Sequence, residues 1–394
     1  MNSEQIANNT DKTPLRILFV SSEVFPFAKT GGLADVSSSL PKALAKEGID
    51  VRVIMPLYRS VIESGIKLEK IAVGIKHRFS GRIFGFDLYS HCAGGVTTYF
   101  VKKDKYFSRK YLYGTPSGDY PDNALRFGYF SRAVLVAAEA IDFQPHIVHC
   151  NDWHTALIPF YLKFFLNNDK FFKGIKTLFT IHNLAYQGIF GKIFMHRLGI
   201  PGSFFTADGL EFYGKLNFMK SGISYSDAIN TVSRKYAEEI MTSEFGCGMD
   251  GLLVARRQNL SGIPNGVDYS QWTPECDRFI KTQYSIDDIG KKLYCKKDLI
   301  DCVDLKIPQD RPIIGYVGRF ADQKGVDFFA DVADKIDDLN AALVILGSGD
   351  AKYDKTFRDM ERNHPENVRV IQAFDEELAH KITAGSDIFI MPSR

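Results

Sequence analysis

The chain has 394 residues, of which 45% are hydrophobic and 24% charged, so it is expected to fold into two or three domains. This composition excludes a disordered tail or a small disulfide-stapled scaffold. Lysine and arginine total 49 against 47 aspartates and glutamates, and the formal net charge of +2 gives no general attraction to nucleic acid or membranes.

The start of the chain carries no targeting pattern. Residues 1–14 form a polar tail without the apolar core of a secretory signal and without the arginines of a transit peptide. The six cysteines form no CxxC pair, so we expect free thiols in a reducing compartment. The longest apolar runs are far shorter than the roughly 20 residues that cross a bilayer. These features predict a soluble, cytoplasmic protein with neither a membrane nor a nucleic-acid partner.

From residue 15 onward, short apolar runs alternate with segments of helical spacing. Arg16–Val20 is predicted as a strand buried on both faces, Leu33–Glu47 as a helix and Val51–Met55 as the next strand. A second helix is predicted over Thr155–Phe165. Further strands are predicted at Val96–Val101, His146–Cys150, Thr177–Ile181 and Ala228–Val232. The rest of residues 60–130 shows no clear pattern, but the alternation as a whole predicts an α/β protein with a doubly wound parallel sheet.

Turn residues cluster in GIPNGVD, residues 262–268, and about 45 mostly polar residues follow before the next strand. We therefore predict a first domain over residues 15–262, and a linker with a second domain over residues 263–394. In the second domain, strands are predicted at Ile313–Val317, Ala342–Leu346, Val368–Ile371 and Asp387–Met391, with helices from Val326, Tyr353 and Glu376. The sequence stops at Arg394 directly after a strand, where a binding loop is expected in such sheets. The second domain is thus expected to be incomplete.

The first candidate motif, KTGGLAD, lies between the first strand and the first helix. The adjacent Gly31 and Gly32 allow close backbone approach to a ligand, the helix start favours an anion, and Lys29 adds a positive charge. A tight turn with an exposed lysine would give the same pattern. The motif lacks the third glycine of GxGxxG and no acidic residue follows the second strand, which disfavours a dinucleotide cofactor and a dehydrogenase.

Two polar clusters follow later strands, HCNDWH at residues 149–154 and HNLAYQG at residues 182–188. Because carboxyl ends of parallel strands meet at one sheet edge, these clusters are expected to lie beside the first motif. Their donors and acceptors suit a polyhydroxylated ligand. The alternatives are a metal site made by the histidines and aspartate of the first cluster, or helix capping by Asn151 or Asp152. A triad hydrolase is disfavoured because no GxSxG occurs.

The fourth motif, GRFADQKG at residues 318–325, lies between a strand and a helix of the second domain. Two cations at a helix start, Arg319 and Lys324, suit a diphosphate, since Arg319 can bind bidentately and Lys324 is a compact charge. An exposed ion pair of Lys324 with Asp322 or Asp327 is the structural alternative.

In chain order, these motifs together with GLEFYGKLNFMKSG, GCGMDGLL, IPNGVD and GSDIFIMPSR resemble the bacterial glycogen synthases and plant starch synthases over residues 16–394. The resemblance implies the GT-B fold, in which two Rossmann-like domains face a cleft. It also implies transfer of glucose from ADP-glucose to the non-reducing end of an α-1,4-glucan such as glycogen, with retention of configuration. We expect neither a metal nor another cofactor, since fixed cations can stabilise a diphosphate leaving group.

The resemblance also implies roles for single residues. The residues implied to be catalytic are His182, Arg319 and Lys324; those implied to bind substrate are Lys29, Gly31, Gly32, Tyr120, Asp152 and Asn265. Arg319 and Lys324 would neutralise the diphosphate of the leaving ADP. His182 would lie beside the transferred glucose, where its ring or backbone stabilises developing positive charge and holds a hydroxyl.

Family members are expected to continue beyond the PSR motif into a segment with a glucose-binding glutamate, a glycine-rich nucleotide loop and a terminal helix. The resemblance therefore predicts little or no synthase activity for these 394 residues alone. Two alternatives stay open. One is a transferase of the same fold that uses another nucleotide sugar, which a donor screen would detect. The other is a catalytically impaired glucan-binding or regulatory protein, which would bind glycogen saturably without transferring sugar.

Overall fold

The computed structural model describes residues 14–79, 81–115, 117–333 and 335–393. They belong to two compact units, Met1–Gly266 (unit 1) and Val267–Arg394 (unit 2). The units thus divide after residue 266, whereas the sequence pattern placed the boundary after residue 262. All but the last residue of the predicted polar tail, residues 1–14, lies outside the described residues.

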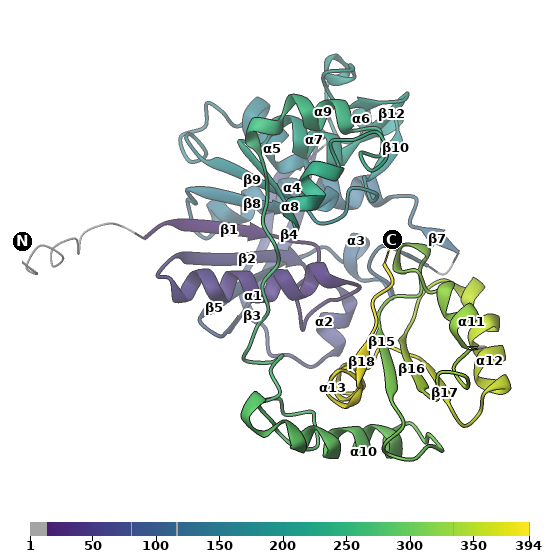
Figure 1. Cartoon of the computed structure of the whole chain (residues 1–394). Helices are drawn as coiled ribbons and strands as arrows, with labels where there is room; N and C mark the ends of the chain where they lie inside the picture. The colour runs from purple at the N-terminus through teal and green to yellow at the C-terminus, as the bar shows by residue number, and fades with distance from the viewer. Residues whose placement is uncertain (1–13, 80, 116, 334, 394) are drawn as a thin grey trace, which may run out of the picture. The chain divides into compact units, whose positions relative to one another are not determined.

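Unit 1 is built on a nine-stranded sheet in the order β14-β13-β9-β8-β1-β2-β5-β4-β3 (Figure 1). Its strands are β1 (Arg16–Val20), β2 (Asp50–Pro56), β3 (Glu69–Phe79), β4 (Arg82–Ala93), β5 (Val96–Lys102), β8 (Ile147–Asn151), β9 (Lys176–Ile181), β13 (Ala228–Thr231) and β14 (Leu260–Gly262). From β14 to β5 all neighbours pair parallel, whereas β4 pairs antiparallel with β5 and β3. After β1 and β2 the chain forms the edge strands β3 and β4 and comes back to β5 beside β2, and it then crosses to β8 on the other side of β1. The strand order therefore reverses between β1 and β8, the place where open α/β sheets bind ligands.

Helices and small strands complete unit 1. The helices are α1 (Gly32–Lys46), α2 (Arg59–Glu63), α3 (Asp104–Phe107), α4 (Asn123–Ala140), α5 (Leu157–Phe165), α6 (Ile193–Arg197), α7 (Phe218–Tyr225), α8 (Arg234–Glu239) and α9 (Asp250–Ala255). The small strands are β6 (Gly114–Thr115), β7 (Gly118–Asp119), β10 (Ile189–Gly191), β11 (Glu211–Phe212) and β12 (Lys215–Asn217). Within the described residues, no helix combines the length and apolar character of a membrane span.

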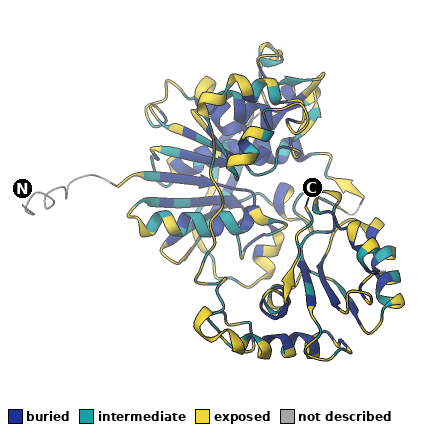
Figure 2. Cartoon of the chain, in the orientation of Figure 1, coloured by how far each residue is buried: buried dark blue, intermediate teal, exposed yellow. Residues whose placement is uncertain are grey.

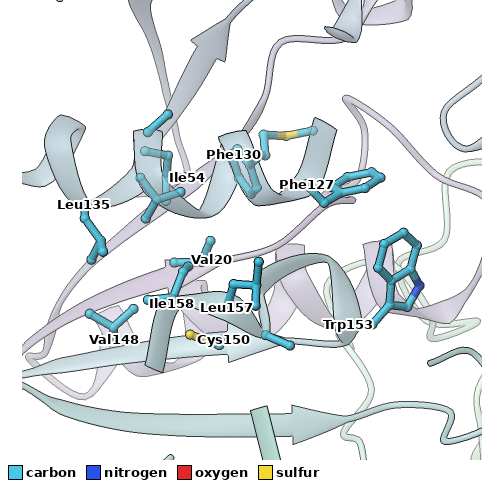
Figure 3. Close-up of a cluster of buried hydrophobic side chains, with 14 of the residues drawn as sticks. Val20, Ile54, Phe127, Phe130, Leu135, Val148, Cys150, Trp153, Leu157 and Ile158 are labelled. Carbon is cyan, nitrogen blue, oxygen red and sulfur yellow. The ribbon is translucent and has the colours of Figure 1, made fainter. Parts of the chain in front are cut away.

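The core of unit 1 lies between α4, α5 and the central strands. Figure 3 shows Phe127 and Phe130 of α4 beside Leu157 and Ile158 of α5, above the strand residue Val148. All five side chains are at most 1% exposed. Burial of each large apolar side chain contributes on the order of 2 kcal/mol, so this layer fixes the strand ends that carry the polar motifs.

Unit 2 contains a four-stranded parallel sheet in the order β17-β16-β15-β18. Its elements are α10 (Lys292–Cys302), β15 (Ile313–Val317), α11 (Phe328–Ala333), β16 (Ala342–Gly347), α12 (Asp354–Asn363), β17 (Val368–Gln372), α13 (Glu376–Gly385) and β18 (Ile388–Phe389). Separate apolar clusters cover the two faces, one with α11 and α12 and the other with α10 and α13. In Figure 2 the strands β15 and β16 are accordingly mostly buried between exposed helix faces. The predicted α/β class with doubly wound sheets is confirmed; the sheet of unit 2 is parallel, and that of unit 1 is parallel from β14 to β5 with antiparallel β4 and β3 at one edge.

The six cysteines are free thiols, as the absence of a pairing pattern predicted.

The turn between β11 and β12 holds a tyrosine in a left-handed backbone conformation that residues with a side chain disfavour. Tyr213 and Gly214 form a two-residue hairpin loop with φ of 47° and 77°. These angles are those of a type I′ turn, whose first position prefers Asn, Asp or Gly. Tyr213 is 80% exposed, so little burial compensates for the left-handed backbone. Tyr213→Asn is therefore expected to raise the free energy of unfolding by about 1 kcal/mol in urea titrations. Tyr213→Ala, which keeps the backbone cost, should give no comparable gain; equal stabilisation by both variants would contradict this explanation.

Candidate active site

Three polar segments meet at the carboxyl edge of the sheet in unit 1. They follow β1, β8 and β9, which are neighbouring strands. The backbone N–H of Asp152, just after β8, donates to the Thr180 carbonyl of β9 at 3.0 Å. The structure thus brings together the KTGG, NDWH and HNL motifs at the point where the strand order reverses.

A buried carboxylate holds the KTGG loop. Thr30 donates to Glu23 from both its backbone N–H and its hydroxyl, the latter at 2.7 Å, and the hydroxyl of Tyr113 donates to Glu23 Oε1 at 2.7 Å. Burial raises the pKa of Glu23, and the hydrogen bonds from Thr30 and Tyr113 act against this rise. Sequence reasoning missed Glu23 as a site residue. A carboxylate three residues after a largely apolar strand was the available signal, since such a group needs several donors to stay buried.

Gly31 and Gly32 lie at the start of helix α1, where an added side-chain carbon would have open space. Gly31 is the N-cap residue and Gly32 the first helical residue. A Cβ atom built on either would meet no atom within 4 Å apart from its chain neighbours and the backbone of the helix itself. Packing therefore does not require glycine at these positions. The backbone N–H of Gly31 bonds the Glu23 carboxylate, and the open space leaves the N–H of Gly32 accessible to an anionic ligand.

Lys29 has local partners. Its ammonium lies 2.9 Å from Asp35 Oδ1 and 5.2 Å from the centre of the Phe25 ring, and its side chain is only 16% exposed. A phosphate at this helix start would compete with the Asp35 carboxylate for Lys29.

Asp152 supports the segment that follows β9. Its Oδ1 accepts the backbone N–H of His182 at 2.8 Å, and the backbone of Asn183 bonds the same carboxyl group. Asp152 has φ 55° and ψ 179°, a region strained for any residue with a side chain. Burial raises its pKa to about 7, and the two backbone hydrogen bonds oppose this rise. The structure therefore uses the Asp152 carboxyl to position His182. The alternative role of Asp152 as a helix cap is not supported, because its side chain makes no capping hydrogen bond to the helical turn that follows.

His182 is a neutral ring at neutral pH. Burial lowers its pKa to about 4, and the nearby Glu23 carboxylate opposes this only in part. Its Nε2 lies 2.9 Å from Oδ1 of Asn151. Because the ring carries no charge, any stabilisation of positive charge on a sugar must come from its dipole or from backbone groups of this segment.

The metal alternative finds no support in the part of the chain that the structure describes. His149 bonds Thr180 Oγ1 through Nε2 at 2.6 Å, and His154 stacks on Trp153 with ring centres 4.0 Å apart. Among the described residues, no three His, Cys, Asp or Glu side chains are grouped as a metal ion would require.

The two remaining substrate-binding candidates of unit 1 lie in different settings. Tyr120 is partly buried under the guanidinium groups of Arg109 and Arg126, which lie 4.5 and 5.0 Å from its ring centre. Its backbone N–H donates to the Tyr113 carbonyl at 3.0 Å, so it adjoins the residue that holds Glu23. Asn265 is exposed on the segment after β14, and no described hydrogen bond links its side chain to the His182 cluster.

In unit 2, Arg319 and Lys324 lie after β15, where that sheet also reverses its strand order. The backbone N–H of Phe320 donates to the Ser348 carbonyl at 3.0 Å, which ties this loop to the glycine-rich loop after β16. Burial lowers the pKa of Lys324, and the neighbouring charge of Arg319 adds to the effect. Asp322 forms an ion pair with Lys352 at 2.6 Å. The two cations thus act on each other at one loop, as an anion site requires.

Gly325 ends this loop with φ 63°, and a Cβ there would lie 2.1 Å from the Pro392 carbonyl oxygen. Only glycine fits, so the backbone after Lys324 is fixed by the segment after β18.

Comparisons with known proteins agree with this arrangement. Residues 16–255 match the family described as "Starch synthase catalytic domain", and residues 301–394 match "Glycosyl transferases group 1". A glycogen synthase of Geotalea daltonii is 45% identical over 381 residues, and one of Thermotoga maritima is 43% identical over 386 residues. Each alignment covers 96% of this chain and 78% of the relative.

A solved structure is also similar to this chain. The catalytic domain of starch synthase IV from Arabidopsis thaliana, bound to ADP and acarbose, is 30% identical with a TM-score of 0.88, over 97% of this chain and 78% of that one. The fold, the sequence motifs and the similar proteins all indicate the same family. The chain belongs to the glycogen synthase and starch synthase family of GT-B glycosyltransferases.

Proposed function

We propose that this chain transfers glucose from ADP-glucose to the non-reducing end of an α-1,4-glucan such as glycogen, with retention of configuration. The observation that carries this proposal is the meeting of the open helix start at Gly31 and Gly32 with the His182 segment at one sheet edge. An anion site beside a neutral, hydrogen-bonding cluster suits a sugar attached to a diphosphate. The relatives named glycogen synthase and the starch synthase structure bound to ADP and acarbose support the same substrate classes.

In the proposed reaction, Arg319 and Lys324 bind the diphosphate of the donor. Negative charge grows on the diphosphate as the bond to the glucosyl carbon breaks, and two fixed cations stabilise it most when that charge is largest. In unit 1, Lys29, Gly31 and Gly32 are proposed to bind substrate. We propose no metal or other cofactor for this step.

His182 is proposed to lie beside the glucosyl group. Its neutral ring and the backbone that Asp152 fixes offer hydrogen-bonding groups to sugar hydroxyls and a dipole to developing positive charge. Tyr120 and Asn265 are proposed to line the glucan site, and we propose a cytoplasmic location because all cysteines are free.

A donor screen tests the proposed substrate. Because the relatives are longer than this chain, the screen uses the chain alone and joined to the C-terminal segment of the Thermotoga maritima relative, here called the extended chain. ADP-glucose, UDP-glucose and GDP-glucose are supplied with glycogen, and new α-1,4 linkages are counted after digestion. We expect ADP-glucose to be preferred. Preference for another nucleotide would favour a transferase of different donor specificity, and saturable glycogen binding without transfer would favour the regulatory alternative.

Gly32→Ala separates a binding role from a structural one. A Cβ at this position contacts no protein atom, and alanine has the higher helix propensity, so the free energy of unfolding should stay equal or rise slightly. The same methyl group would obstruct a phosphate at the helix start. We expect the KM for ADP-glucose to rise about tenfold in the extended chain. Gly290→Ala, also in open space but in unit 2 away from the motifs, serves as the control. Unchanged kinetics in Gly32→Ala would remove these glycines from the site.

A further inference from the structure

Asn151, the last residue of β8, connects three strands through one amide group. Its Nδ2 lies 3.0 Å from the carbonyl oxygen of Val20 in β1, and its Oδ1 lies 2.9 Å from Nε2 of His182 after β9. Asn151 is 1% exposed, so both contacts are shielded from water. Substrate-binding candidates taken from the sequence did not include this residue.

The Val20 carbonyl determines which way the amide points. A carbonyl oxygen only accepts, so the Asn151 atom facing it must be the NH₂ group. The carbonyl of His149, 3.4 Å from the same nitrogen, imposes the same orientation. The opposite orientation would place Oδ1 against two acceptors and the NH₂ group against the histidine. Oδ1 therefore faces His182, and it can only accept.

The orientation of the amide in turn determines the proton on His182. An acceptor at 2.9 Å from Nε2 requires a proton on Nε2. A neutral imidazole has one N–H, so Nδ1 keeps its lone pair. The low pKa of His182, caused mainly by burial, keeps the second proton off the ring at neutral pH. The neighbouring His149 has the same tautomer. The Thr180 hydroxyl donates its proton to Asn230 Oδ1, so Thr180 Oγ1 accepts a hydrogen bond from Nε2–H of His149.

We propose that Asn151 is a positioning residue that holds His182 as the neutral Nε2–H tautomer, so that Nδ1 accepts a hydrogen bond from a hydroxyl of the transferred sugar. This inference rests on the proposed function for the sugar contact, whereas the tautomer itself follows from the ligand-free hydrogen bonds. Asn151 and Asp152 act on the same residue in different ways. Asp152 fixes the backbone of His182, and Asn151 fixes the ring and its proton.

The carboxyl groups near His182 form no described hydrogen bond with its ring that would select a tautomer. Asp152 is bonded to the backbone N–H and not to the ring. Glu23 acts on the ring through its charge, and its carboxylate accepts hydrogen bonds from Thr30, Gly31 and Tyr113. The Asn151 amide is therefore the group whose replacement should change the ring.

The test is the ¹⁵N spectrum of the full chain labelled at its nine histidines. Long-range ¹H–¹⁵N correlations distinguish the two tautomers and the imidazolium, and the His182 signals are assigned by their loss in His182→Gln. At pH 7 we expect a protonated Nε2 and an unprotonated Nδ1. In Asn151→Leu, which is similar in size and cannot accept, the signals should move to averaged positions of both tautomers. A protonated Nδ1 in the unaltered chain, or unchanged His182 signals in Asn151→Leu, would overturn the proposal.

Two further variants keep the test informative if Asn151→Leu does not fold. Asn151→Asp replaces the amide with a carboxylate, which should raise the pH at which His182 becomes imidazolium by at least one unit. No shift in that midpoint would overturn the proposal. Asn230→Leu removes a partly buried amide contact on the neighbouring strand β13 and serves as the matched control, because the His182 signals should not change.

Transfer kinetics test the sugar contact separately. In the extended chain, Asn151→Leu is expected to lower kcat for glucose transfer by about tenfold or more. Unaltered kcat with an altered tautomer would overturn the positioning role. If the unaltered extended chain transferred no glucose, the proposed function would fail and the sugar contact with it, while the spectra would still decide the tautomer.

Discussion

Lys324→Ala in the extended chain is expected to lower kcat for glucose transfer by about 10²- to 10³-fold and to change the KM for ADP-glucose far less. Removing one fixed donor from a site of developing negative charge has effects of this size. Lys324 is partly buried beside Arg319, so its charge is incompletely screened by water when the donor occupies the loop. The diphosphate gains charge in the transition state, which is why turnover should suffer more than binding.

Lys355→Ala is the matched control for this variant. Lys355 is an exposed lysine of α12 in the same unit, and its removal changes net charge equally. Initial rates at varied ADP-glucose give kcat and KM for both. A change confined to KM in Lys324→Ala would contradict the role in leaving-group stabilisation, as would an equal loss in Lys355→Ala.

The second large effect is a fall in stability as the pH is lowered from about 6.5 to 5. Burial lowers the pKa of His149 to about 3 and, together with nearby positive charges, that of His77 to about 4. The pKa of His182 is likewise lowered to about 4, and that of His154 lies well below its ordinary value. In the unfolded chain these rings titrate near pH 6.5. Between pH 6.5 and 5 the unfolded state therefore binds more protons, and the free energy of unfolding decreases with falling pH.

Two buried carboxyl groups act in the opposite direction. The pKa of Asp152 is raised to about 7 by burial, and that of Glu23 is raised for the same reason. Both take up protons in the folded state earlier than in the unfolded state, so acid favours folding at these two positions. Four histidines against two carboxyls leave a net excess of protons on the unfolded chain. Each excess proton contributes about 1.4 kcal/mol per pH unit.

Urea titrations at pH 7.5, 6.5, 5.5 and 5.0 measure this dependence. His149→Gln, which keeps a donor toward Thr180 and cannot be protonated, should reduce the slope by about 1.4 kcal/mol per pH unit. A free energy of unfolding that is constant or rises toward pH 5 would show that these histidines are not held neutral. A slope unaltered in His149→Gln would show that another group causes the pH dependence.

The central strands of both sheets were predictable because they are largely buried. Arg16–Val20 and Ile313–Val317 are strands over the predicted residues. A short, mostly apolar run followed by polar residues is typical of a strand buried on both faces. Helix α4, in contrast, was not recognised. Thirteen of its eighteen residues are buried, including Arg126, so no polar face marked the helical period. The long hairpin of β3 and β4 was also missed, because its register shifts break the alternation of polar and apolar residues.

The sequence predicted which strand ends form the site, but it did not predict the hydrogen bonds between the site residues. Lys29, Asp152 and His182 follow neighbouring strands, and parallel topology alone brings them to one edge. The supporting groups were not predictable from spacing. Glu23 reaches Tyr113 across 90 residues, and Asn151 meets His182 across 31. Such hydrogen bonds depend on where loops return in space, which the periodicity of the sequence does not encode.

The measurement that tests the account most directly is incorporation of radiolabelled glucose from ADP-glucose into glycogen by the extended chain, beside the 394-residue chain and the Thermotoga maritima relative. We predict incorporation by the extended chain into α-1,4 linkages and its loss in Lys324→Ala. No incorporation by a folded extended chain, under conditions in which the relative is active, would contradict the assignment of this chain as a glucan synthase.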